Sequence, residues 1–184
     1  GIDFYNTWQL IWAFAHALHQ YWKKFGHFPS AVHPTTYNEK VLWFKFFGEL
    51  RVPYAGDKLS TGLLIPAELR SQVACMPVVW ESTQPELPAN GTIAPGIYYL
   101  KANLGTGMFA RVKYPLSNEQ RQKLEARTRR WLAARPGLDR GEWWYNTFEP
   151  KIFMECSVTG DEDSISWNFY VLNGQIPMIG LFTK

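Results

Sequence analysis

Cysteine is scarce in this chain of 184 residues, which contains 2 Cys. Cys75 and Cys156 lie far apart, in neither a metal-binding nor a redox spacing, and each stands in an apolar segment. We therefore expect two buried free thiols in a reducing compartment. A disulfide-rich secreted domain is not what this sequence favours.

An excess of one charge is also missing, since the formal net charge is +3. That excess is too small to indicate nucleic acid as a partner. Long apolar runs are missing too: the segment 10–18 is short and contains His16, whereas a membrane span needs roughly 20 apolar residues. No charged segment precedes it, so we expect no signal peptide, no membrane span and a soluble, cytoplasmic protein.

Aromatic residues, in contrast, are abundant. They make up 16% of the chain, which has 9 Trp, and they concentrate in the first fifty residues and in 131–145. Such clusters are typical of a packed core or a partner interface. We expect the N-terminal aromatic helices to contact another subunit or another domain.

Apolar residues at helical spacing predict a first helix from Trp8 to Gly26. A capping box of Thr36 and Glu39 starts a second helix that ends at Gly48. A third helix is expected near Asp57. A basic helix is expected from Ser117 to about residue 134, and its basic residues are Arg121, Lys123, Arg127, Arg129 and Arg130, followed by Arg135 and Arg140. A solvated helix face and a site for an acidic partner both remain open for this helix.

Strands are predicted at 76–80, 97–102, 108–113 and 151–157, and a hairpin joins 165–172 to 176–182 across Asn173-Gly174. Helices come first and mixed elements follow, so we predict an α+β fold with a helical segment 1–55 and a second portion 56–184.

The most informative motif is a strand that ends in Lys101 and enters the turn Asn103–Gly107. Glycines let backbone N–H groups approach a phosphate, and a lysine supplies a point charge. The spacing differs from the P-loop and from the dinucleotide-binding fingerprint. An ordinary hairpin turn remains the alternative.

Further pieces follow in a fixed order: Asp57-Lys58, Leu100–Asn103, Gly105-Thr106-Gly107, Pro150-Lys151, Glu155 and the hairpin segment 169–174. In this order they resemble the ATP-grasp superfamily, and specifically its polysaccharide-associated branch named after teichuronopeptide biosynthesis (TupA-like). The resemblance runs from roughly Phe25 to the end of the chain. It implies N-terminal helices, an antiparallel lid subdomain at about 97–157 and the start of a second sheet.

The resemblance also implies roles. Lys58 and Lys101 would hold ATP phosphates, the glycine turn would cover them, and Glu155 would lie beside adenine and ribose. The implied cofactor-binding set is Lys58, Lys101, Asn103, Gly105, Thr106, Gly107 and Glu155. With Mg²⁺, such an enzyme joins a carboxylate to an amine through an acyl phosphate, here in surface-polysaccharide biosynthesis with an acidic or uronate acceptor.

The sequence departs from the family pattern at Leu104, where a histidine is usual, and at Asn168, where a lysine is usual. The family's magnesium ligands lie on later strands, and the acidic run Asp161-Glu162-Asp163 is a poor substitute. No catalytic residue and no metal ligand can be assigned from this sequence. We expect either part of a longer ligase or a shortened relative that has lost catalysis.

Two other interpretations stay open. One is a non-catalytic module whose aromatic helices and basic helix bind a partner protein or an acidic glycan. The other is a sugar transferase of the same pathway, which would need an acidic metal motif. The four histidines, among them the pair His16 and His19, are expected to pack or to face solvent rather than to bind zinc.

Overall fold

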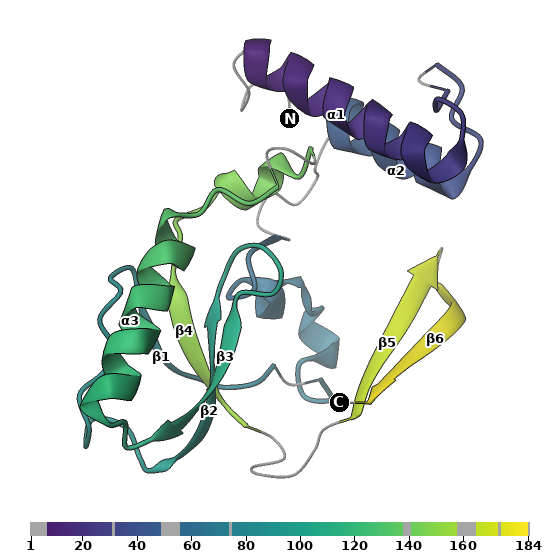
Figure 1. Ribbon diagram of the computed structural model, residues 1–184. Helices are drawn as coiled ribbons and strands as arrows, with labels where there is room; N and C mark the ends of the chain where they lie inside the picture. The colour runs from purple at the N-terminus through teal and green to yellow at the C-terminus, as the bar shows by residue number, and fades with distance from the viewer. Residues whose placement is uncertain are drawn as a thin grey trace.

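The computed structural model describes residues 7–30, 32–48, 56–73, 75–137, 141–157, 165–172 and 174–183. Within these ranges the chain forms a pair of helices, a four-stranded antiparallel sheet with one helix on it, and a two-stranded hairpin (Figure 1). The predicted α+β class is confirmed.

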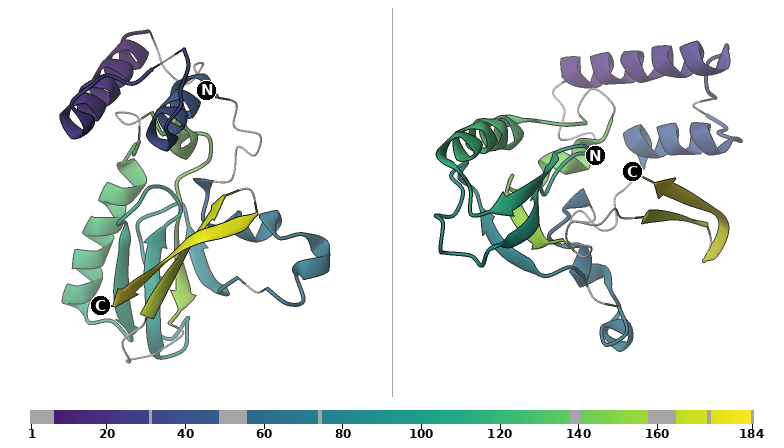
Figure 2. Two further views of the ribbon diagram at one scale, coloured as in Figure 1. Left: turned by 90° about the vertical axis from the view of Figure 1, so that its right-hand side faces the viewer. Right: turned by 60° about the horizontal axis from the view of Figure 1, so that its bottom comes forward.

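The helical pair consists of α1 (Thr7–Phe25) and α2 (Tyr37–Phe47), which lie one above the other (Figure 2). Both helices were predicted, and the capping box at the start of α2 is present. Ala13 of α1 and Phe46 of α2 are buried together with Trp143, which belongs to the short 3-10 helix η6 (Trp143–Asn146). This small core joins the helical pair to the rest of the chain.

The sheet has the strand order β1-β4-β2-β3, and all its pairs are antiparallel. Its strands are β1 (Val78–Ser82), β2 (Gly96–Ala102), β3 (Phe109–Tyr114) and β4 (Ile152–Cys156). The four strands expected from the sequence are confirmed with shifts of one or two residues at most of their ends. The sheet extends beyond the expected range of 97–157, because β1 pairs with β4.

Helix α3 (Asn118–Ala133) covers one face of this sheet, and Ser117 and Gln120 form its capping box as predicted. Side chains alternate along a strand. Tyr98, Leu100 and Ala102 therefore point into the core under α3, where they are buried with Trp131 of the helix. The intervening residues of β2 point to the opposite face, which we call the open face.

Two expectations were wrong. The helix expected near Asp57 is replaced by two 3-10 turns, η3 (Thr61–Leu64) and η4 (Ala67–Leu69). The Asp57 carboxylate accepts the N–H of Leu59 and the hydroxyl of Ser60, which closes a local turn instead of starting an α-helix. Cys75, expected to be buried, is exposed because it precedes β1 and lies outside the sheet, while Cys156 is half-buried and both thiols are free.

The predicted hairpin is confirmed as β5 (Ile165–Leu172) paired with β6 (Gln175–Thr183). Neighbouring residues of β5, among them Phe169 and Tyr170, are exposed, so both faces of the hairpin present aromatic side chains. The acidic run 161–163, like Asn173, lies outside the described residues. Within the described ranges, no helix has the length and apolar character required to cross a membrane.

The Glu39 side chain ties the segment between the two N-terminal helices to the start of α2. Its carboxylate accepts backbone N–H groups of Ser30 at 2.9 Å, Thr35 at 3.0 Å and Thr36 at 2.9 Å. These hydrogen bonds, with that of Ser30 the strongest, lower the pKa of Glu39 from 4.5 to about 2. The folded state therefore favours the ionised carboxylate.

We predict that the stability contributed by Glu39 is present above about pH 4.5 and is lost as the pH falls toward 2, because the folded-state pKa lies below the unfolded value. Glu39→Gln should destabilise the helical pair at neutral pH, and the difference from wild type should shrink as the pH falls through this window. Thermal unfolding between pH 2 and 7, followed by circular dichroism, measures it. Glu119→Gln, which neutralises a 75% exposed carboxylate in α3 outside the helical pair, is the control for the loss of one carboxylate.

Candidate functional site

Several of the residues implied in phosphate binding meet where β2 ends. The ammonium of Lys58 donates to the carbonyl oxygens of Ala102 at 2.9 Å, Leu104 at 3.1 Å and Gly105 at 2.7 Å. An ammonium has three N–H donors, so these bonds occupy all of them. In this conformation Lys58 fastens the glycine turn and does not present a donor to a ligand.

Lys101 points to the open face from the end of β2. It pairs with Glu155 of β4, which lies on the same face because Tyr99 is opposite Glu155 and Phe153 is opposite Lys101 in the register. The side chain of Lys101 is 32% exposed and that of Glu155 17%. Lys101 is thus reachable from solvent while its charge is balanced by a carboxylate.

Asn103 is fully buried between the end of β2 and the start of β4. Its Nδ2 donates to the carbonyl of Glu149 at 3.0 Å, and its Oδ1 accepts the N–H of Lys151 at 2.9 Å. Its own N–H donates to the carbonyl of Lys151, and its carbonyl accepts the N–H of Lys58 at 3.1 Å. The structure therefore places Asn103 as the link between three segments.

The turn after β2 depends on two glycines with positive φ, Gly105 at 66° and Gly107 at 74°. A Cβ on Gly105 would lie 3.1 Å from Cγ of Pro136, whereas one on Gly107 would meet no atom within 4 Å. At Gly105 both the positive φ and the contact with Pro136 disfavour a side chain, whereas at Gly107 only the positive φ does. Thr106 stands exposed between them.

The two lysines influence each other electrostatically. Lys58 is exposed as a residue, but its ammonium is surrounded by carbonyl oxygens. This loss of hydration, followed by the positive charge of Lys101, lowers the pKa of Lys58 below 10.5, and Asp57 opposes the shift. Two cationic side chains therefore lie near the glycine turn, and the carboxylates of Glu155 and Asp57 balance them.

The residues that are present do not fit a magnesium site. In the described parts of the chain, no three His, Cys, Asp or Glu side chains gather in a way that could hold a metal ion. The nearby carboxylates are engaged, because Asp57 closes its own turn and Glu155 pairs with Lys101.

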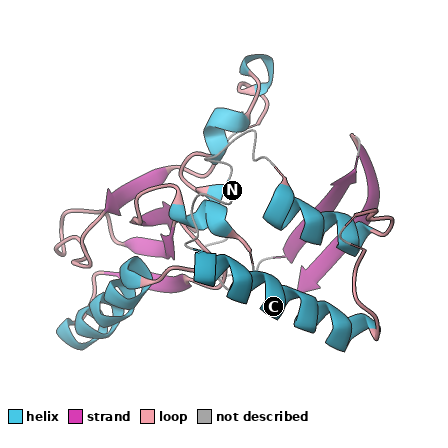
Figure 3. Cartoon of the chain, turned by 90° about the horizontal axis from the view of Figure 1, so that it is seen from above, coloured by secondary structure: helices cyan, strands magenta, loops and turns pink. Residues whose placement is uncertain are grey.

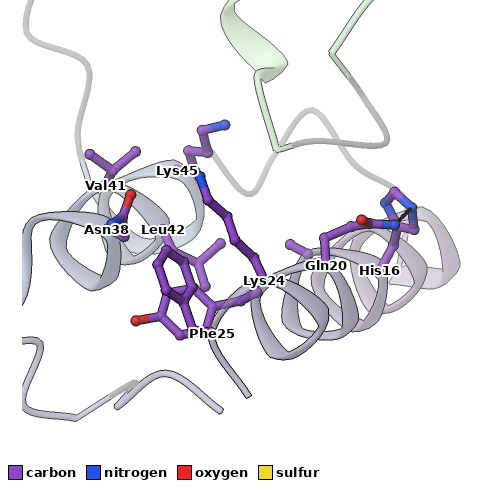
Figure 4. Close-up of a pocket in the computed structure, with 10 residues that line it drawn as sticks. His16, Gln20, Lys24, Phe25, Asn38, Val41, Leu42 and Lys45 are labelled. Carbon is purple, nitrogen blue, oxygen red and sulfur yellow. Dashed lines mark hydrogen bonds between the residues drawn. The ribbon is translucent and has the colours of Figure 1, made fainter. Parts of the chain in front are cut away.

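A groove of about 620 Å³ lies elsewhere, between α1 and α2 (Figure 4). His16, Gln20 and Lys24 line one wall at four-residue spacing along α1, and Lys45 of α2 faces them. None of the implied cofactor-binding residues lines this groove. The spacing of the three α1 residues is visible in the sequence, but that they face α2 is not.

Several basic side chains of α3 make hydrogen bonds or ion pairs within the described parts of the chain. Arg121 donates to the carbonyls of Leu87 and Pro88, and Arg127 donates to the carbonyl of Phe109. Arg135 donates to carbonyls at the end of the helix itself, Lys123 pairs with Glu119, and Arg140 lies outside the described residues. The exposed pair Arg129 and Arg130 is what this helix offers to an acidic partner.

Comparisons with protein-family models, with curated proteins and with solved structures find no match for this chain.

We predict that Asn103→Ala destabilises the protein by about 2–3 kcal/mol, because the buried N–H of Lys151 and the carbonyl of Glu149 lose their partner. Urea unfolding measures the loss. Thr106→Ala, at an exposed position of the same turn, should change stability by less than about 0.5 kcal/mol. Equal effects of the two substitutions would contradict the linking role of Asn103.

We also predict that Lys101→Met raises the pKa of Lys58, because a like charge is removed while the loss of hydration remains. The pKa should stay below 10.5 for the same reason. A titration of the lysine Cε resonances by NMR follows it. Lys113→Met, an exposed lysine on β3, is the control and should leave Lys58 unchanged.

Proposed function

We propose that this chain binds the phosphates of ATP at the glycine turn beside Lys58 and Lys101, as the nucleotide-gripping part of a cytoplasmic ATP-dependent carboxylate–amine ligase of surface-polysaccharide biosynthesis. The observation that carries the proposal is the Lys58 ammonium on the carbonyls of the glycine turn, with Lys101 on the adjoining end of β2. A phosphate at this turn would gain charge-assisted hydrogen bonds from both lysines in exchange for the Glu155 ion pair and the carbonyl contacts.

The positions of Lys101 and Glu155 on the sheet support the proposal. The resemblance implies a small antiparallel sheet, a lysine and a glycine turn at the phosphates, and Glu155 beside adenine and ribose. Lys101 and Glu155 do lie on the open face, opposite α3. Their exposure leaves room for a ligand to reach Lys101.

Binding requires a change of partners at this site. A phosphate near Lys101 would replace its ion pair with Glu155, and the released carboxylate could then accept hydrogen bonds from the ribose or from the adenine amino group. Lys58 would turn from the turn carbonyls toward the phosphate, and the turn, no longer fastened, would be free to close. The chemistry that these residues supply is positioning and charge stabilisation.

A non-catalytic module is the second candidate. It is favoured by the same hydrogen bonds, which occupy Lys58 and Lys101 within the chain, and by the lack of a metal-binding group among the described residues. Such a module would bind ATP weakly or not at all and would act through a partner. ATP turnover to ADP with a uronate acceptor would exclude it.

We predict that ATP at a hundred times its dissociation constant stabilises the wild-type protein by about 2.7 kcal/mol. For a chain of this size, the melting temperature should rise by about 5–10 °C. Lys101→Ala should abolish most of this rise, because the accessible phosphate partner is lost. A thermal-shift titration with ATP, with and without Mg²⁺, measures it.

Lys113→Ala is the matched control, since it removes a lysine from the neighbouring strand of the same sheet. Its ligand-induced shift should equal that of wild type. A lack of any shift in the wild-type protein, or the same loss in both variants, would refute phosphate binding at the glycine turn.

A further inference from the structure

The groove between the two N-terminal helices has an apolar base. Seen from above, α1 and α2 run side by side (Figure 3). Ala17 and Tyr21 line the groove from α1, and Val41 and Leu42 line it from α2. Tyr21 is buried and the other three are half-buried, so these four residues form the deeper part of the groove, which we call its base.

Polar side chains form the rim of the same groove. Gln20, Lys24 and Asn38 line it and are exposed, whereas His16 and Lys45 are half-buried. The Gln20 Nε2 lies 3.2 Å from the His16 Nε2. Figure 4 shows the Lys24 side chain extending from α1 across the groove toward Lys45 of α2. A molecule in the groove would therefore contact an apolar base and hydrogen-bond donors along one rim.

The lining of the groove carries one positive charge that no carboxylate balances. Its lysines are Lys24 and Lys45, and among the described residues no Asp or Glu lines it. The ammonium of Lys45 pairs with Glu142 at 3.0 Å. Lys24 has no ion pair within the described ranges, and its Nζ lies 5.3 Å from the centroid of the Phe25 ring. Glu39 of α2 is occupied by backbone N–H groups, so its carboxylate does not compensate Lys24.

We propose that this groove binds a small organic carboxylate with an extended apolar body. The Lys24 ammonium and the Gln20 amide would donate to the carboxylate, and the apolar body would lie on the base of the groove. From His16 to Lys24 the helical rise is about 12 Å, which sets the length of the body. The volume of about 620 Å³ lies within the range of roughly 300–1,000 Å³ that is typical of small-molecule sites.

A carboxylate fits this lining better than a phosphate does. Phosphates carry up to two negative charges and are held by several cationic groups or by the backbone N–H groups of a helix N-terminus. The groove offers one unbalanced ammonium and a neutral amide, which match a single negative charge. The proposal is independent of nucleotide binding, because no residue of the glycine turn lines the groove.

The test is an NMR titration of the full chain with octanoate, and with octanol as a neutral molecule of the same chain length. Octanoate should shift the amide resonances of groove residues such as Ala17 and Val41, and the dissociation constant follows from the same spectra. Octanol should bind about fivefold more weakly or worse, because it leaves the Lys24 charge without a partner.

Lys24→Gln should weaken octanoate binding about fivefold and should leave octanol binding unchanged. Lys23→Gln is the matched control, because it removes the adjacent exposed lysine, which does not line the groove. This control should bind octanoate like wild type. Both substitutions change exposed side chains, and unchanged thermal unfolding excludes misfolding as the cause of a loss.

Equal affinities for octanoate and octanol, or equal losses in the two lysine variants, would overturn the proposal. Tighter binding of octyl phosphate than of octanoate would contradict the assignment of a carboxylate. Resonance shifts confined to the exposed tryptophans of α1 and to the hairpin would show adsorption to apolar surface instead of binding in the groove. The absence of any shift in the wild-type spectra would also refute it.

Discussion

The hydrogen bonds of Asn103 are the constraint on which the candidate site depends. One buried side chain joins the end of β2 to the segment that enters β4, and its backbone carbonyl holds the N–H of Lys58. The same stretch then supplies the carbonyls that bind the Lys58 ammonium. The position of the glycine turn and its contacts with Lys58 follow from this small network. Because it is buried, each of its bonds is expensive to leave unmade.

The charges of the site are balanced within the chain in this conformation. Lys101 pairs with a carboxylate, and Lys58 binds the negative ends of backbone dipoles. A ligand must therefore exchange partners rather than fill a vacant position, and its affinity is the difference between the new contacts and the old ones. In the described conformation Lys58 fastens the turn, whose two glycines have positive φ.

The apolar surfaces of the molecule have two different origins. The sheet under α3 is a closed core, in which Leu100, Ile152 and Met154 have no exposed area. One side of α1 and both faces of the hairpin remain exposed. On α1 the exposed aromatic residues lie on the side away from α2, whereas Lys24 lines the groove that faces α2.

The sequence by itself determined the elements whose signals are local. The capping boxes at Thr36 and Ser117, the strand at 97–102 and the pairing of the C-terminal hairpin strands depend on neighbours within a few residues, and the structure confirms each of them. The helix predicted near Asp57 was wrong, because the Asp57 carboxylate closes a local turn instead of capping a helix. The meeting of Lys58 with the glycine turn joins residues more than forty positions apart, and so does the pair of Lys101 with Glu155. Only the tertiary structure decided these contacts. It also decided that Arg121 and Arg127 bond to carbonyls within the fold, and which side of α1 is exposed. Each of these depends on strand order and packing, which no local spacing specifies.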